Sequence, residues 1–427
     1  MNPPVLLPID VRTPLSRESL DEITGHLRLQ GQELMRKKSR AHIIQTLAGI
    51  AKCWCLETYS LRKRAIDLLP KNTGFSREMI ARAIDLTFSK MTQSVLTDYC
   101  NKELETFFKP VSGVIGHVAP GNLFAPVVQS LFHGLLVQSP NFIRTSAHDL
   151  HFPVLLAQSL IDADLELSDA LAVAHWSSAN VGLNREFASE VDTLVVYGSE
   201  TTLEEWRALQ PAGKRFVGFG NRVSIGFISQ AGLDQPDKTA PAAALDVALY
   251  DQQGCLSPHC FYLENPSPRQ WTAFGSRLTE ELRKLDSELP IGALSREEEL
   301  IIGNVRDRHL FLASLAPEKN RPWFSKTAAW TVLFENEPVF LPSCLHRTIW
   351  LRPVPRFPQL ADALKEWRGK LQCIGTDLSN EQIHEHVHLL RDLGFTRICA
   401  LGSMQAPPMT WPNGGCSLLK QLTSGVP

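Results

Sequence analysis

The sequence lacks the short motifs that identify several large enzyme classes. G-x-G-x-x-G, G-x-x-x-x-G-K-[ST] and G-x-S-x-G are all absent from its 427 residues, so an ordinary Rossmann dehydrogenase, a P-loop NTPase and an α/β-hydrolase lose their main support. A net charge of −2 gives no sign of binding to nucleic acid or an anionic membrane. The most apolar long stretch, 111–137, contains two histidines and two prolines, so we expect no membrane span.

Disulfides are not expected either. The nine cysteines are an odd number, scattered along a chain that is long enough to fold without covalent links. We therefore expect reduced thiols and a cytoplasmic protein. The opening residues, MNPPVLLPIDVRTPLSRES, have no basic segment followed by an apolar core, so no secretory signal is expected.

Helical periodicity dominates the first part of the chain and then gives way to alternation. Apolar side chains recur at helical spacing from Met79 to Val95, and Ser19-Leu-Asp-Glu22 matches a capping box. From residue 111 on, apolar runs at 111–119, 141–146, 169–176 and 191–198 are each followed by helix-compatible sequence. For the last of these helices, overlapping capping boxes at Thr201 and Thr202 predict the start. This alternation indicates βαβ units and a mostly parallel sheet.

The same alternation continues towards the C-terminus. We predict strands at 259–264, 330–335, 348–354, 371–377 and 397–400, and helices at 269–289, 358–370 and 380–393. The fold class is therefore α/β, with two α/β lobes and a boundary close to Cys255. The predicted division is a helical region 1–110, a nucleotide-binding domain 111–250, a catalytic domain 251–400 and a C-terminal segment 401–427.

One metal motif is present. His384-Glu385-His386-Val387-His388 matches H-E-x-x-H, which on a helix can place two imidazoles on zinc with the glutamate as base. After His388 the chain has no further histidine or glutamate to serve as third ligand. A solvated helix face explains the motif better, so we predict no metal site; a zinc peptidase is a remote alternative.

Three other segments could carry chemistry together. Pro120-Gly121-Asn122 forms a turn between strand and helix, where backbone can approach a ligand closely. Gly198-Ser199 ends a strand and opens a helix, whose N–H groups could hold a phosphate. The string YDQQGCLSPH then supplies the thiol of Cys255. Taken singly, each has a plain structural explanation, because glycine is common at such turns and a lone cysteine is more often core than nucleophile.

In order, these pieces resemble one family. The segments GHVAPGNLFAPVVQSLFHGLLVQSPNFIRTS, VVYGSETTLEEW, FVGFGNRVSIGFIS, ALDVALYDQQGCLSPHCFYLE and LGSMQAPPMTW are similar to the LuxC-type acyl reductases, a branch of the aldehyde dehydrogenase superfamily. The resemblance implies a nucleotide-binding lobe, a catalytic lobe and a cleft between them. It also implies reduction of a long-chain acyl thioester to an aldehyde by NADPH, through an acyl-cysteine.

The resemblance assigns roles to individual residues. Cys255 is the expected nucleophile, and its backbone N–H and the side chain of Asn122 are the expected oxyanion donors. Gly198 and Ser199 match the turn that faces the dinucleotide phosphates. Arg144 stands where many superfamily members carry a lysine near the adenosine ribose; a guanidinium suits a 2′-phosphate, which favours NADPH, although Arg144 could equally cap a strand end. His117 and His259 are expected to be structural.

One departure from the superfamily favours reduction. Oxidising aldehyde dehydrogenases carry a general-base glutamate in an E-L-G-G stretch, whereas the corresponding FGNRVSIGFIS here has no acid. An oxidising dehydrogenase with another base, and an acyl-holding subunit without hydride chemistry, remain as alternatives. The family implies an acyl donor, which is acyl-CoA, an acyl carrier protein or an acyl-protein synthetase, and a homo-oligomer. The sequence does not choose among these donors.

Overall fold

A computed structural model describes residues 15–104 and 110–423, which form two compact units. Residues 15–73, 80–104, 110–221 and 408–423 belong to the first unit, and residues 74–79 and 222–407 to the second. The start of the chain, on which the absence of a secretory signal was predicted, falls mostly outside the described residues. In the described part, no helix combines the length and the apolar character needed to cross a membrane.

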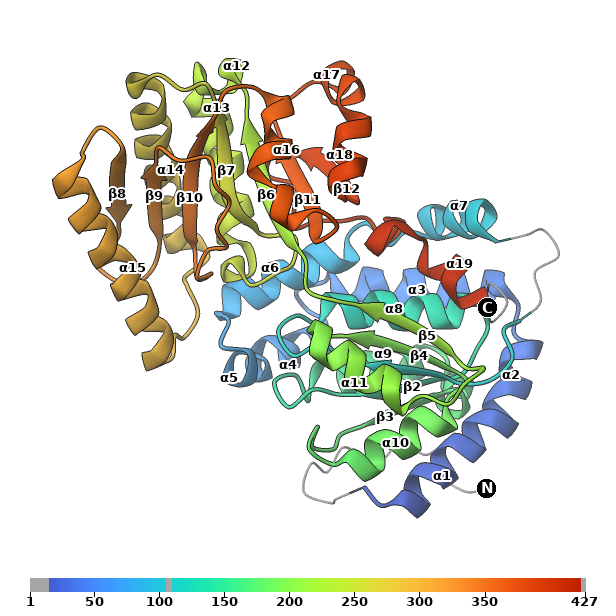
Figure 1. Ribbon diagram of the computed structural model, residues 1–427. Helices are drawn as coiled ribbons and strands as arrows, with labels where there is room; N and C mark the ends of the chain where they lie inside the picture. Colours follow the sequence, from blue (N-terminus) through green and yellow to red (C-terminus); the bar gives the residue numbers. More distant parts are fainter. Residues whose placement is uncertain (1–14, 105–109, 424–427) are drawn as a thin grey trace. The chain divides into compact units, whose positions relative to one another are not determined.

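The chain up to residue 104 is helical, as predicted (Figure 1). Its helices are α1 (Arg17–His26), α2 (Gln32–Lys37), α3 (Arg40–Trp54), α4 (Ser60–Leu68), α5 (Pro70–Thr73), α6 (Arg77–Phe88) and α7 (Gln93–Glu103). The N-cap of α1 is Ser16, whose hydroxyl accepts from the backbone N–H of Ser19. The predicted capping box was therefore placed one turn too late: Ser19 lies inside the helix, because the cap is set by where extended backbone ends.

A five-stranded parallel sheet forms the centre of the first unit. Its strands are β1 (Ile115–Val118), β2 (Asn141–Arg144), β3 (Leu171–Ala174), β4 (Thr193–Tyr197) and β5 (Arg215–Phe219), in the order β3-β2-β1-β4-β5. Its helices are α8 (Ala125–Leu136), α9 (Phe152–Ala163), α10 (Val181–Glu190), α11 (Glu200–Leu209) and, near the C-terminus, α19 (Leu418–Thr423). Helices α8 and α9 pack with α3, whereas α10 packs with α1 and α11. Apolar residues of α1 share a core with Phe187 of α10 and Trp206 of α11.

The second unit is built on a seven-stranded sheet. Its strands are β6 (Val223–Ile228), β7 (Pro258–Glu264), β8 (Asn320–Phe324), β9 (Thr331–Glu335), β10 (Thr348–Val354), β11 (Leu371–Thr376) and β12 (Arg397–Ala400). They lie in the order β12-β11-β6-β7-β10-β9-β8, and all pairs are parallel except β8–β9. Its helices are α12 (Gln230–Leu233), α13 (Pro236–Ala248), α14 (Pro268–Glu288), α15 (Arg296–Leu315), α16 (Leu360–Ala363), α17 (Asn380–Glu385) and α18 (Val387–Leu393). These two parallel sheets confirm the predicted α/β class.

Some elements were missed or misplaced by the sequence patterns. Strands β5, β6 and β8 and helix α15 were not predicted. Both β5 and β6 contain an internal glycine, which weakens a strand pattern; at Gly226 the Phe261 ring takes the space of a side chain, since an added Cβ would lie 2.0 Å from it. The helix predicted at 358–370 is only short helical turns, which end at Gly369 with φ of +80°.

Candidate functional site

The first unit has a topological switch point at the carboxyl edge of its sheet. Strands β1 and β4 are neighbours although β2 and β3 lie between them in sequence, so the strand order reverses here. Val118 of β1 pairs with Val196 of β4, so the turn that contains Gly121 and Asn122 and the turn that contains Gly198 follow neighbouring strands at the same edge of the sheet. In open parallel sheets, ligands bind at this position, outside the carboxyl ends of the strands.

Helix α11 begins at this edge. Ser199 is its N-cap and accepts from the backbone N–H of Thr202, so the helix starts two residues before the predicted Thr201. The correction follows from the extended backbone of Ser199, whose hydroxyl replaces the missing helical acceptor. Gly198 packs against Thr202, since an added Cβ would lie 2.7 Å from Thr202 Cγ2. The contact with Thr202 is by itself a sufficient reason for a glycine at position 198. The N-terminus of α11 is a separate feature, and it favours an anion.

Arg144 and Asn122 lie at the same edge with different surroundings. Arg144 is the last residue of β2; its buried guanidinium donates to the carbonyl of Trp176 at 3.1 Å and lies over the Trp176 ring. Burial lowers the pKa of Arg144. The bond to Trp176 fits the strand-end role considered above, but it uses one of the five guanidinium donors and does not exclude a phosphate. Asn122 is exposed in the turn after β1.

His117 is a structural residue in β1, as expected. Its Nδ1 lies 2.7 Å from Ser130 Oγ and its Nε2 lies 2.8 Å from Asn141 Oδ1. Burial lowers the pKa of His117 to about 4, so the imidazole is neutral at pH 7. Both nitrogens are occupied, which leaves this ring no free position for proton transfer.

Cys255 lies in the second unit, in the loop between α13 and β7. It is exposed, three residues before the start of β7, and its carbonyl accepts from the buried Ser224 Oγ of β6 at 2.7 Å. The segment that was matched to the base-bearing stretch of oxidising dehydrogenases therefore contacts the cysteine directly. It supplies a hydroxyl, not a carboxylate.

Cys255 is neither buried in a core nor bridged to another cysteine. All nine cysteines are free, and Cys260, the nearest in sequence, is fully buried in β7. Desolvation raises the pKa of the Cys255 thiol to about 11, although the residue is exposed; its own backbone N–H and Arg222 act in the opposite direction. The sequence argument required a lowered pKa or a proton acceptor. The structure gives a thiol that is protonated at pH 7, so a proton acceptor is needed.

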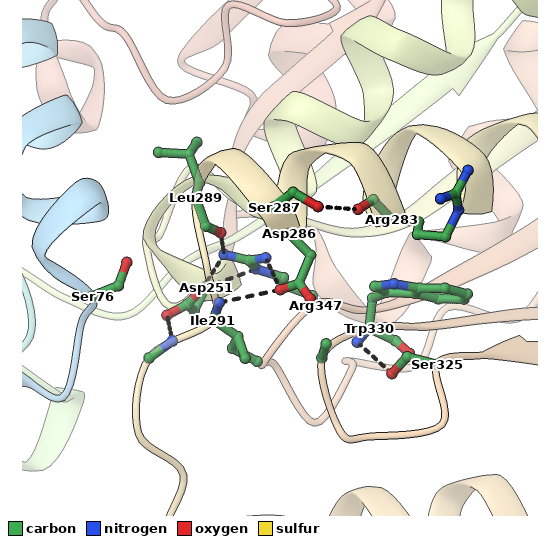
Figure 2. A network of polar contacts seen from close by, with 12 residues as sticks. Ser76, Asp251, Arg283, Asp286, Ser287, Leu289, Ile291, Ser325, Trp330 and Arg347 are labelled. Carbon is green, nitrogen blue, oxygen red and sulfur yellow. Dashed lines mark hydrogen bonds and ion pairs between the residues drawn. The ribbon is translucent and has the colours of Figure 1, made fainter.

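Two left-handed turns flank this loop. Tyr250, Asp251 and Gln252 have φ of 54°, 49° and 64°, and residues 345–347 have φ between 50° and 65°. For residues other than glycine, this conformation costs about 1–2 kcal/mol each. It is stabilised by a fully buried ion pair, in which Arg347 Nη2 lies 2.7 Å from Asp251 Oδ1 (Figure 2).

The same arginine ties the turns to the end of α14. Arg347 Nη2 donates to the carbonyl of Leu289 at 2.7 Å, and Nη1 lies 3.3 Å from Asp286 Oδ1. Asp251 Oδ2 also accepts from the backbone N–H of Gly292 at 3.0 Å. The sequence analysis missed this network because its members are far apart in sequence and match no motif.

The two remaining candidates have plain structural explanations. His259 is buried in β7, and its Nδ1 accepts from the backbone N–H of Ser343 at 3.1 Å; burial lowers its pKa to about 4. The H-E-x-x-H segment does not form one helix, because His386 leaves helical geometry with φ −109° and ψ 7°. The predicted helix 380–393 is thus divided, and His384 and His388 do not lie one turn apart on a common helix.

Comparisons with known proteins agree with this architecture. A family model described as "Acyl-CoA reductase (LuxC)" matches residues 35–424. Long-chain acyl-protein thioester reductase 2 of Photobacterium leiognathi is 24% identical over 342 residues, which cover 75% of this chain and 70% of that protein.

Solved structures show the same fold. Aldehyde dehydrogenase 21 of Physcomitrella patens, in complex with succinate, gives a TM-score of 0.66 at 12% identity, covering 91% of this chain and 82% of that one. A glyceraldehyde-3-phosphate dehydrogenase of Methanocaldococcus jannaschii, complexed with NADP, gives 0.65 at 14% identity, covering 92% and 87%. At these identities the likeness shows the aldehyde dehydrogenase-like fold alone.

Proposed function

The chain belongs to the LuxC family of acyl-CoA reductases, and from this premise we propose that it reduces a long-chain fatty acyl thioester to a fatty aldehyde through an acyl group on Cys255. One observation carries the proposal: Cys255 is an exposed thiol held in a loop between two strained turns. Strained backbone of this kind is retained at functional sites.

The first step is attack of the Cys255 sulfur on the thioester carbonyl, with departure of the donor's thiol. At a pKa of about 11, only about one thiol in ten thousand is ionised at pH 7. The proton must therefore leave the sulfur during attack, and it ends on the departing thiolate of the donor, which balances the exchange. Ser224 and Arg222 are two polar neighbours of Cys255, and neither is a carboxylate.

The tetrahedral oxyanion requires hydrogen-bond donors. We assign this role to the Cys255 backbone N–H and the Asn122 side-chain amide, following the superfamily pattern. Removing one such donor typically lowers turnover on the order of 10²–10³-fold. Asn122 is exposed in its turn, which is consistent with a side chain that acts on a ligand.

A nicotinamide cofactor, when bound, supplies the hydride that reduces the acyl-cysteine. The residues at the carboxyl edge of the first sheet suit the phosphates of such a group: Gly198 has no side chain, and Ser199 begins a helix at the switch point. We propose NADPH as this cofactor, although solved structures of the same fold are complexed with NAD in one case and with NADP in another. Arg144, the last residue of β2 at the same edge, supports the preference, because one bond to Trp176 uses only one of its five donors.

Protection of the acyl group from water favours reduction over oxidation. The segment matched to the base-bearing stretch of oxidising dehydrogenases has no acid, and its Ser224 bonds to the backbone carbonyl of Cys255. The acyl donor is an acyl-CoA, an acyl carrier protein or an acyl-protein synthetase, and the family pattern implies a homo-oligomer in the cytoplasm.

Intact mass measurement tests the proposal. The protein is incubated with palmitoyl-CoA, first without nucleotide and then with NADPH, beside a Cys255→Ala variant. Acylation of the parent alone, with aldehyde released on adding NADPH, is expected. An adduct that persists after NADPH would show an acyl-holding subunit instead, and absence of any adduct with acyl-CoA or acyl carrier protein would refute the role of Cys255.

A further inference from the structure

The backbone of the Cys255 loop is held by two buried side chains that the proposed mechanism does not use. Ser224 Oγ donates to the carbonyl of Cys255 itself at 2.7 Å and accepts from the backbone N–H of Cys373 at 3.1 Å. Ser224 is 0% exposed, and the β6 ladders are irregular on both sides of it. Next to the cysteine, the Ser224 side chain therefore bonds to backbone groups of two neighbouring segments, where the strand ladders are irregular.

Gln252 closes the same loop from its other end. Its Nε2 donates to the carbonyl of Pro258 at 2.7 Å and to that of Thr348 at 2.8 Å. Residues 252 and 258 bracket Cys255, so the first bond fixes the ends of a short loop around the thiol. Since Thr348 follows the second left-handed turn, the other bond joins the two turns.

The geometry of Gln252 is costly, which argues that it is retained for the loop. The residue is fully buried at φ 64°, and its Oε1 has no hydrogen-bond partner in the described part of the structure. A buried amide oxygen without a partner is destabilising, because its desolvation is not compensated. Its side-chain nitrogen donates to the backbone carbonyls of Pro258 and Thr348.

We infer that Ser224 and Gln252 are positioning residues that align the Cys255 thiol and backbone N–H for attack on the acyl carbonyl. The inference rests on the proposed function of Cys255. Neither side chain has to touch the substrate: each fixes a carbonyl, and through it the direction of the sulfur and of the adjacent N–H. Displacements of about 1 Å in such an arrangement cost on the order of 100-fold in rate.

The first unit contains closely matched controls. Gln138 is buried at φ 55° and donates through Nε2 to the carbonyls of Lys38 and Met35, at 2.6 and 3.3 Å. Ser139 is 0% exposed and donates to the carbonyl of Gly113 at 2.6 Å. Gln138→Met and Ser139→Ala thus remove similar bonds from buried side chains to backbone carbonyls, but in the other unit.

The test is the rate of Cys255 acylation by palmitoyl-CoA without nucleotide, measured by stopped reaction and intact mass over a range of acyl-CoA concentrations. Gln252→Met is expected to lower the maximal rate on the order of 10–100-fold and Ser224→Ala about 5-fold, with the half-saturating concentration unchanged. The maximal rates of the control variants are expected to lie within 2-fold of the parental rate, because their hydrogen bonds do not hold the Cys255 loop. A 2-fold change in rate corresponds to about 0.4 kcal/mol.

The outcomes separate the inference from the function it rests on. A parent that is not acylated on Cys255 would remove the proposed function. A parent that is acylated, with Gln252→Met and Ser224→Ala acylating at the parental maximal rate, would overturn only the positioning role, as would equal losses in the control variants. If Gln252→Met does not fold, Gln252→Asn withdraws the amide by one methylene, and a parental rate in that variant overturns the role of Gln252.

Discussion

Replacing Arg347 by methionine is expected to destabilise the second unit by about 3–5 kcal/mol, because it leaves a carboxylate buried without its cation. The side chains of Arg347 and Asp251 are 0% and 2% exposed. Methionine fills part of the space, but it cannot donate to Asp251 or to the carbonyl of Leu289. For a unit of this size, the loss corresponds to a fall in Tm of about 6–20 °C.

The loss is expected to depend on pH. Burial raises the pKa of Asp251 above its ordinary value, and Arg347 is the largest influence that lowers it. Without Arg347 the folded-state pKa rises further. A group whose pKa is higher in the folded state than in the unfolded state does not destabilise the protein at pH values below the unfolded-state pKa. Its destabilising effect on the free energy of unfolding develops as the pH increases towards the folded-state pKa. The deficit of Arg347→Met should therefore be larger at pH 7 than at pH 5.

Differential scanning calorimetry of the parent and variants at both pH values checks this prediction. Arg277→Met, which breaks a partly exposed cluster with Asp237 and Glu281, is the control and should leave Tm nearly unchanged. The double variant Asp251→Asn, Arg347→Met should lose the pH dependence of the deficit. A loss under 1 kcal/mol for Arg347→Met, or a deficit that grows on acidification, would refute the reasoning.

Three further predictions concern the thiol, a buried histidine and the nucleotide edge. Because the pKa of Cys255 is raised to about 11, its alkylation by iodoacetamide, followed by peptide mass mapping against Cys255→Ala, should rise about tenfold per pH unit from 7 to 10; a plateau below pH 8.5 would contradict this. Burial lowers the pKa of His117 to about 4, whereas the unfolded chain protonates this histidine below about pH 6.5. The free energy of unfolding should therefore fall from pH 7 to pH 4, and the Tm of His117→Gln should fall less steeply over this range. Parallel plots of Tm against pH for the parent and the variant would exclude the effect. Gly198→Ala brings a methyl group to 2.7 Å from Thr202 and should raise the Kd for NADPH at least about tenfold, as measured by titration calorimetry. The control Gly49→Ala, in α3 with open space around the added methyl group, should leave this Kd unchanged. Equal Kd values for the parent and Gly198→Ala would argue against nucleotide binding at this edge.

Local patterns were sufficient for much of the architecture. Strand β10 was predicted with its observed limits, 348–354, because its mostly apolar run is typical of a buried parallel strand, and β12, a partly exposed edge strand, was also predicted at its observed limits, 397–400. The string around Cys255 was enough for the family, which the match over residues 35–424 confirms. The patterns failed at β6, where the glycine that interrupts the run is explained only by the ring of Phe261 from the next strand.

Composition, periodicity and one cysteine-containing string determined the fold class, the family and the candidate nucleophile. Only the tertiary structure decided which residues surround that nucleophile. Ser224 and Gln252 match no motif, since their hydrogen bonds run to the carbonyls of residues 255, 258 and 348, which chain folding alone brings together. The ion pair of Asp251 with Arg347 spans 96 positions for the same reason. A sequence pattern records neighbours along the chain, whereas burial and left-handed backbone depend on contacts that form only when separate strands meet.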